Sequence, residues 1–129
     1  MQLLLATHAL LWWALDSEHL SKKARRALKD LNNDVYVSAA PAWEIGTKFR
    51  IGKLPEAESF VHSFRDTLQR LGFLELPITV EHAQRAGLML IEHKDPFDRM
   101  LVCQRMADNL VLMTPDPLVR QYRGIQVEW

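Results

Sequence analysis

The stretch from His93 to Asp116 reads HKDPFDRMLVCQRMADNLVLMTPD, and its first half has the features of a complete helix. Asp95 is a favourable N-cap residue, Pro96 suits the first helical position, and Asp98 falls in the first turn. Asn109 can end the helix in the left-handed conformation. The sequence therefore predicts a helix at residues 96–108.

The second half of the same stretch predicts a buried strand. Residues 110–113 are Leu-Val-Leu-Met, a short apolar run, and residues 114–117 turn the chain out of it. Asp98 thus lies at a helix start, and Asp116 lies just beyond the carboxyl end of a strand. In an open α/β sheet these two positions share one edge, where ligands bind. We therefore expect both carboxylates at one functional site.

Bulk properties restrict the class of protein. The chain has 129 residues, 48% of them hydrophobic and 25% charged, which predicts one globular domain over residues 1–129. The formal net charge is zero, so any contact with nucleic acid depends on a local patch. The single cysteine, Cys103, excludes an internal disulfide and predicts a cytoplasmic location. The apolar segment at residues 3–15 is too short to span a membrane.

Apolar runs and helical periodicity alternate along the whole chain. Strands are predicted at residues 2–5, 35–37, 73–76, 110–113 and 125–127. Helices are predicted at residues 8–15, 22–31, 57–71, 80–90 and 96–108, with a further helix from Pro41 to Gly52, and with Thr7, Ser21 and Thr79 as caps. Alternation of strands and helices implies an α/β fold with a mainly parallel central sheet, covered by helices on both faces.

Glu44 lies within the first turn or so after the second predicted strand, so three acids converge on one edge of the expected sheet. Carboxylates crowded together repel one another unless a cation joins them, and a hard divalent ion is the natural partner. Mg²⁺ or Mn²⁺ would suit oxygen ligands and activate a water to cut a phosphodiester. The other interpretation is local, because helix capping alone explains Asp98 and Asp116 one at a time.

Four segments resemble, in order, the motifs of PIN-domain ribonucleases of the VapC toxin type. They are residues 3–13 (LLLATHALLWW), 39–45 (AAPAWEI), 93–101 (HKDPFDRML) and 114–116 (TPD). The resemblance implies a three-layer α/β/α fold and a Mg²⁺- or Mn²⁺-dependent endoribonuclease that acts on RNA. It also implies a homodimer and a cognate antitoxin protein that covers the site.

The resemblance also implies roles for individual residues. Glu44, Asp98 and Asp116 take the acidic, metal-binding roles, with Asp98 as the direct ligand. Thr7 and Thr114 orient acids or bound water through their hydroxyl groups. Two further residues are accessory candidates, Asp95, which is otherwise only a cap, and Arg99, which together with Lys48, Arg50 and Lys53 could grip RNA phosphates or be ordinary solvated surface.

One position departs from the family pattern. The family carries a metal-binding aspartate at the end of the first strand, where this chain has Ala6. Alanine offers no oxygen, so we expect weak metal binding and little or no cleavage by this chain. Ala6 has a purely structural explanation, which is tight packing of a small residue beside a strand end. If it instead replaces a lost aspartate, the chain is either an engineered variant, disarmed to protect the cell that makes it, or a naturally inactive member.

Several other features carry two interpretations. Trp12 and Trp13 are adjacent, so one of them should reach a surface and contact a second copy or the antitoxin, unless it lies at the rim of the core. The apolar side of the predicted helix 57–71 is core or a groove for an antitoxin helix. His8 and His93 lie near the expected site, but the five histidines lack the spacing of a zinc site.

Two function classes therefore remain. The first is a metal-dependent endoribonuclease, inactivated at Ala6, and the second is a non-catalytic PIN-fold module that binds RNA or protein. A nucleotide-binding fold of the flavodoxin type is excluded, because the chain has no glycine-rich phosphate loop.

Overall fold

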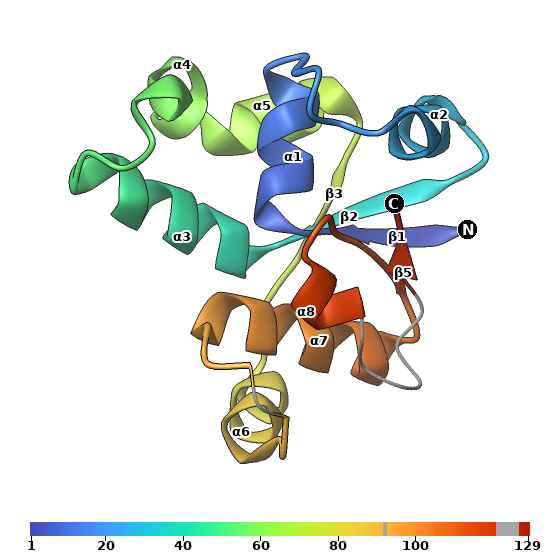
Figure 1. Ribbon diagram of the computed structural model, residues 1–129, viewed down its shortest axis with the longest axis vertical. Helices are drawn as coiled ribbons and strands as arrows, with labels where there is room; N and C mark the ends of the chain where they lie inside the picture. The colour runs from blue at the N-terminus through green and yellow to red at the C-terminus, as the bar shows by residue number, and fades with distance from the viewer. Residues whose placement is uncertain (92, 121–126) are drawn as a thin grey trace.

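A computed structural model (Figure 1) describes residues 1–91, 93–120 and 127–129 of the chain. Within these residues five strands form one sheet in the order β3-β2-β1-β4-β5, and every neighbouring pair is parallel. The strands are β1 (Gln2–Leu5), β2 (Asp34–Ser38), β3 (Leu74–Leu76), β4 (Val111–Met113) and β5 (Val127–Glu128). The predicted parallel α/β fold is confirmed. Residues 125 and 126 of the last predicted strand lie outside the described residues.

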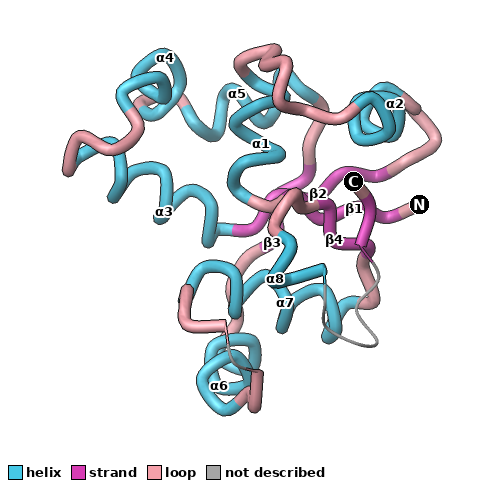
Figure 2. The backbone as a smooth tube through the Cα atoms, viewed as in Figure 1, coloured by secondary structure: helices cyan, strands magenta, loops and turns pink. Residues whose placement is uncertain are grey.

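Helices cover both faces of the sheet (Figures 1 and 2). One face carries α1 (Thr7–Ala14), α2 (Lys22–Lys29), α3 (Ala39–Arg50), η1 (Pro55–Ala57), α4 (Glu58–Val61) and α5 (Phe64–Leu71). The other carries α6 (Val80–Leu88), α7 (Pro96–Asp108) and α8 (Pro117–Arg120). None of the helices in the described part of the chain is long and apolar enough to cross a lipid bilayer.

The alternation of side chains along β1 creates the two halves of the core. Leu3 and Leu5 pack into the cluster under α1 to α5, whereas Leu4 packs with Leu101 and Leu112 in the cluster under α7. All five leucines are at most 1% exposed. Since β1 is buried on both faces, its continuous apolar sequence is what a central parallel strand requires. The predicted three-layer α/β/α arrangement is thus confirmed.

Strand order fixes where a site can form. From β1 the chain first winds outward through β2 to the edge strand β3, and it then crosses to the other side of β1 to form β4 and β5. The winding therefore reverses between β1 and β4. At such a point the connections leave β1 and β4 in opposite directions, so a crevice opens at the carboxyl ends of these two strands.

The predicted single helix at residues 57–71 is wrong. The chain leaves helical geometry at Ser63, with φ −129° and ψ 36°, and divides into η1, α4 and α5. His62, at the break, packs edge-on against Phe49 of α3 with ring centroids 6.0 Å apart. Ser63 is the N-cap residue of α5, and serine is favoured at that position, so the break coincides with a local helix start inside the apolar pattern.

Three local predictions also need correction. Ala6, not Thr7, is the N-cap of α1, and the Thr7 side chain is used elsewhere. Helix α3 begins at Ala39 under a cap from Ser38, two residues before Pro41. Helix α2 ends at Lys29, which leaves Leu31 99% exposed instead of on the apolar side. The caps at Ser21, Thr79 and Asp95 are confirmed.

Candidate active site

A cleft of about 420 Å³ opens at the carboxyl ends of β1 and β4. Glu44, Asp98 and Asp116 all line it, although they lie on α3, on α7 and after β4. The structure therefore brings the three acids together in one cleft, where the sequence predicts them. The remaining lining residues are Ala6, Thr7, His8, Trp12, Lys48, His93, Asp95, Thr114, Pro115 and Pro117.

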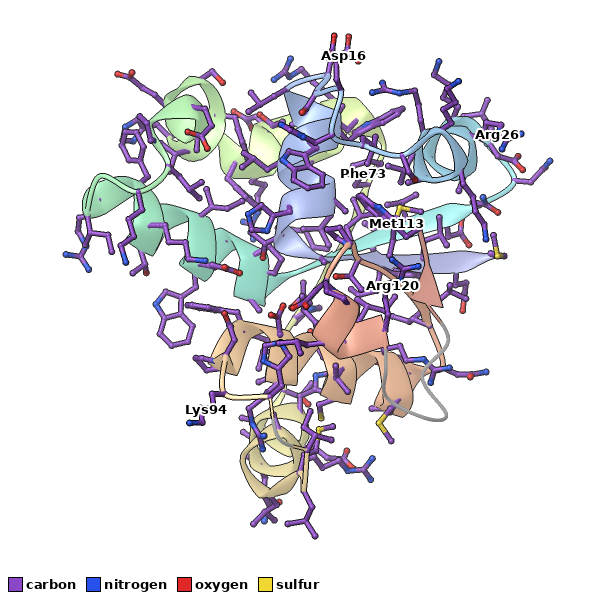
Figure 3. All side chains as sticks on the ribbon, viewed as in Figure 1. Asp16, Arg26, Phe73, Lys94, Met113 and Arg120 are labelled. Carbon is purple, nitrogen blue, oxygen red and sulfur yellow. The ribbon has the colours of Figure 1, made fainter. Side chains whose placement is uncertain are left out.

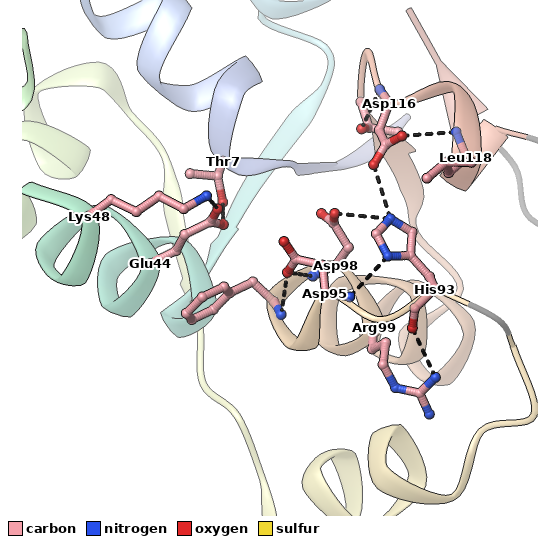
Figure 4. A network of polar contacts seen from close by, with 11 residues as sticks. Thr7, Glu44, Lys48, His93, Asp95, Asp98, Arg99, Asp116 and Leu118 are labelled. Carbon is pink, nitrogen blue, oxygen red and sulfur yellow. Dashed lines mark hydrogen bonds and ion pairs between the residues drawn. The ribbon is translucent and has the colours of Figure 1, made fainter. Parts of the chain in front are cut away.

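His93 joins two of the acids (Figure 4). Its Nε2 atom lies 3.1 Å from Oδ2 of Asp116 and 3.2 Å from Oδ2 of Asp98, and its side chain is only 8% exposed. Its Nδ1 atom accepts the backbone N–H of Asp95 at 3.2 Å. In a neutral imidazole the other nitrogen then carries the hydrogen. His93 is accordingly a donor that bridges the two carboxylates.

The pKa values of the two bridged acids are shifted in opposite directions. Burial of the Asp98 carboxyl, and next the nearby Asp95 carboxylate, raises the pKa of Asp98 to about 7, although His93 opposes this. Burial also acts to raise the pKa of Asp116, but hydrogen bonds from His93 and from the backbone N–H of Leu118 outweigh it. The pKa of Asp116 is therefore lowered. A proton on the pair belongs mainly to Asp98.

Asp95 and Thr114 shape the chain around this pair. Oδ1 of Asp95 accepts the backbone N–H groups of Phe97 and Asp98, which caps α7 and places Asp98 in its first turn. The Thr114 hydroxyl is buried and accepts the backbone N–H of Asp116 at 3.1 Å. Each residue thus fixes the backbone that carries one of the two acids.

Glu44 lies on the opposite wall of the cleft and is bound to two other residues (Figure 4). The Thr7 hydroxyl donates to its Oε1 atom at 2.5 Å, and the Lys48 ammonium pairs with its Oε2 atom. Glu44 is 4% exposed, whereas the Lys48 side chain is 32% exposed. The Thr7 hydroxyl therefore orients an acid, as the motif comparison predicted, and Lys48 brings a cation to the cleft.

Ala6 also lines the cleft, directly after β1 and beside β4. It is 5% exposed, and its N–H donates to the carbonyl of Met113, which ends β4 and is labelled in Figure 3, at 3.0 Å. Position 6 is thus held beside the strand that leads to Asp116. Its methyl group lines the cleft without adding an oxygen.

The accessory role expected for Arg99 needs correction. Its guanidinium donates four hydrogen bonds of 2.7–3.2 Å to the carbonyls of Ala86, Met89, Ile91 and His93. Arg99 is also not among the residues that line the cleft. The Arg99 guanidinium therefore binds backbone carbonyls of α6 and of the chain that follows it, and these bonds hold it away from RNA phosphates in the cleft.

The donor atoms of His93, Asp98 and Asp116 all lie within 4.8 Å of one another, which suits a single metal ion. Neighbouring ligands of an octahedral ion stand about 3 Å apart when each bond is about 2.1 Å. The separations of 3.1 and 3.2 Å match this spacing. The residues present therefore fit a divalent ion. Its binding would displace the Nε2 hydrogen of His93 or turn the ring away.

Sequence reasoning gave too little weight to two cleft residues. His93 was only one of two histidines expected near the site, and Lys48 was grouped with residues of a surface patch. His93 stands two residues before the cap residue Asp95 and accepts its backbone N–H, a contact that only the structure shows. Lys48 stands at i+4 from Glu44, which is the spacing of a helical ion pair.

A parallel α/β sheet with an acidic cleft at its switch point places the chain among small α/β proteins whose candidate site lies at the carboxyl edge of the sheet. The model of the PIN domain family matches residues 3–124, and the chain belongs to this family.

Individual relatives agree with the family assignment. Over 64 residues the chain is 38% identical to Ribonuclease VapC16 of Mycobacterium tuberculosis, an alignment that spans 50% of this chain and 44% of that protein. The fold is similar to the structure of DNA-bound VapBC from Salmonella typhimurium, with TM-score 0.70, 16% identity and 99% and 97% of the two chains covered. VapBC2 from Rickettsia felis bound to a promoter DNA fragment gives TM-score 0.68, 14% identity and 99% and 98% coverage.

Proposed function

We propose that the chain is a VapC-type toxin of a toxin–antitoxin pair, with the active site of a Mg²⁺- or Mn²⁺-dependent endoribonuclease. The observation that carries the proposal is the convergence of Asp98 and Asp116 at the carboxyl edge of the sheet, with donor atoms close enough for one ion. The partial match to a relative named as a ribonuclease supports the reaction class.

Asp98 and Asp116 would hold the ion, and Glu44 would complete the acidic set from the opposite wall. A bound divalent ion supplies an activated water and stabilises charge on the phosphodiester. Thr7 and Lys48 hold Glu44 in one orientation, and the exposed part of Lys48 offers a cation to an RNA phosphate. Thr114 and Asp95 keep the backbone of the two other acids in place.

Ala6 limits the activity of this chain. Without an oxygen at position 6, the ion has fewer anionic ligands, and we propose that the chain is strongly impaired. The bridge from His93 favours a second candidate, a non-catalytic PIN-fold module that binds RNA or protein. Asp98 and Asp116 already share a donor in His93, so the folded site is satisfied without an ion.

We also propose an antitoxin protein as partner and a homodimer as the assembly. The structural neighbours described as VapBC complexes support a protein partner of this kind. The free, buried thiol of Cys103 is compatible with the reducing cytoplasm, where we place the protein.

Cleavage of single-stranded RNA by four proteins tests the proposal. They are the chain itself, Ala6→Asp, Ala6→Asp with Asp98→Asn, and Ala6→Asn, each assayed with Mn²⁺ and with EDTA. We expect cleavage by Ala6→Asp alone, dependent on Mn²⁺, together with growth arrest when it is expressed without a partner. If Ala6→Asp binds Mn²⁺ but leaves RNA intact, the nuclease assignment fails and the binding module stands.

A further inference from the structure

Aromatic rings form a cluster along one side of the acidic cleft. His8 and Trp12, one turn apart on α1, both line the cleft, with ring centroids 5.5 Å apart. Trp12 is backed by His19 at 5.3 Å and by Trp129 at 5.8 Å. His8 is exposed and Trp12 is half-buried. The cluster is therefore a supported set of rings with its outer member in solvent.

The aromatic cluster begins next to the acidic residues. Helix α1 starts at Thr7, whose hydroxyl donates to Glu44, and His8 follows Thr7 directly in the chain. The two sides of the cleft differ in chemistry. Asp98 and Asp116 lie across the cleft and suit an ion that could contact a phosphate, whereas His8 and Trp12 offer ring faces. A nucleotide has the same division between its phosphate and its base.

We propose that His8 and Trp12 form a stacking subsite for one unpaired base of single-stranded RNA, next to the phosphate held at the acids. This subsite rests on the proposed ribonuclease function. An unpaired base is required because the faces of paired bases are covered in an RNA helix. Stacking on aromatic rings tolerates any base, so the subsite would select unpaired RNA rather than a sequence.

The subsite gives Trp12 a role that its neighbour does not share. Trp12 and Trp13 both pack against the core beneath α1, but only Trp12 lines the cleft. A contact between Trp12 and another protein chain is the other interpretation of the same ring. The two differ in one measurable respect, because only a base subsite senses whether the RNA carries a base at that position.

The test measures the binding of a fluorescein-labelled uridine octamer by anisotropy, in Mn²⁺, with the chain as it stands. The variants are His8→Ala, Trp12→Leu and, as matched control, Trp43→Leu. Trp43 is 66% exposed, pairs with Phe97 and lies outside the cleft. We expect Kd to rise about 5- to 150-fold for His8→Ala and Trp12→Leu, the range for loss of one base–ring stack, and no change for Trp43→Leu.

An octamer that is abasic at every position provides the second arm, because a uridine octamer can shift its register past a single missing base. It should bind more weakly than the uridine octamer, and Trp12→Leu should then have no further effect. The subsite is overturned, while RNA binding itself stands, if all three variants bind as tightly as the unmodified chain or if the fully abasic octamer binds as tightly as the uridine octamer. If neither the unmodified chain nor Ala6→Asp binds RNA, the proposed ribonuclease function fails together with the subsite. His8→Ala removes an exposed side chain, so it keeps the test valid if Trp12→Leu does not fold.

Discussion

Restoring a carboxylate by Ala6→Asp should have opposite effects on the metal-free and the metal-bound protein. Position 6 is 5% exposed and is hydrogen-bonded to Met113 beside the Asp116 strand. A third carboxylate there meets Asp98 and Asp116 without an ion. Two like charges about 5 Å apart repel by roughly 3 kcal/mol at an effective dielectric constant of about 20. We therefore expect the metal-free variant to unfold more easily, by about 2–3 kcal/mol.

A divalent ion should reverse this loss. Partners that only orient a ligand already change metal affinity by about 10–100-fold, and a direct anionic ligand should contribute at least as much. A hundredfold gain in affinity, measured with metal in excess, adds about 2.7 kcal/mol to the free energy of unfolding. Mn²⁺ should therefore raise the Tm of Ala6→Asp by several degrees more than that of the unmodified chain.

Titration calorimetry with MnCl₂ and thermal unfolding with and without the ion measure both effects. Ala6→Asn is the matched control, because it adds the same volume without the charge. We expect its metal affinity to stay near that of the unmodified chain. Equal Mn²⁺ affinity for Ala6→Asp and the unmodified chain would refute the reasoning, and so would an equal gain for Ala6→Asn.

Three other perturbations have expected outcomes. The pKa of Asp98 is raised to about 7 in the folded protein. Between about pH 4 and about pH 7 the folded state therefore keeps a proton on Asp98, whereas the unfolded state has released it. Unfolding free energy of the metal-free protein should thus fall as pH rises from about 4 to about 7, by a few kcal/mol at most. Asp98→Asn should flatten that slope in urea titrations, and an unchanged slope would contradict the assignment. Thr7→Val leaves Oε1 of Glu44 without its donor and should cost about 1–3 kcal/mol in urea unfolding, whereas Thr7→Ser should retain most of the stability. A Thr7→Ser protein as unstable as Thr7→Val would show that the methyl group matters instead. Arg99→Met removes four hydrogen bonds to carbonyls and should lower the Tm markedly while the intrinsic RNA affinity of the folded protein stays unchanged. A stable Arg99→Met protein with weakened RNA binding would restore the phosphate role that the structure denies.

Local chemistry made much of the α7 region predictable. The Asp95 cap, the proline after it and the left-handed Asn109 each depend on residues within a few positions of one another. Strand β4 is also predictable locally, because residues 110–113 form a continuous apolar run. The convergence of Asp98 and Asp116 followed from a general rule, because helix starts and strand ends share an edge in a parallel sheet.

Contacts between distant residues were not predictable from local chemistry. Thr7 looked like a helix cap, but its hydroxyl binds Glu44, 37 positions away. Arg99 looked like a free surface cation, yet it fastens four carbonyls of the preceding segment. In each case the side chain has more than one chemically acceptable partner, and only the fold decides which one is near.

The loss at position 6 and the bridge from His93 fit together physically. With aspartate at position 6, three carboxylates would face one another, and the metal-free site would carry the repulsion worked out above. With Ala6 that added carboxylate is absent, and one imidazole N–H lies within hydrogen-bonding distance of an oxygen of Asp98 and of an oxygen of Asp116. Because its pKa is raised to about 7, Asp98 is only partly ionised near neutral pH, and the pair carries less than two full negative charges. A site in this condition is stable without an ion, and the same features that stabilise it lower its affinity for one.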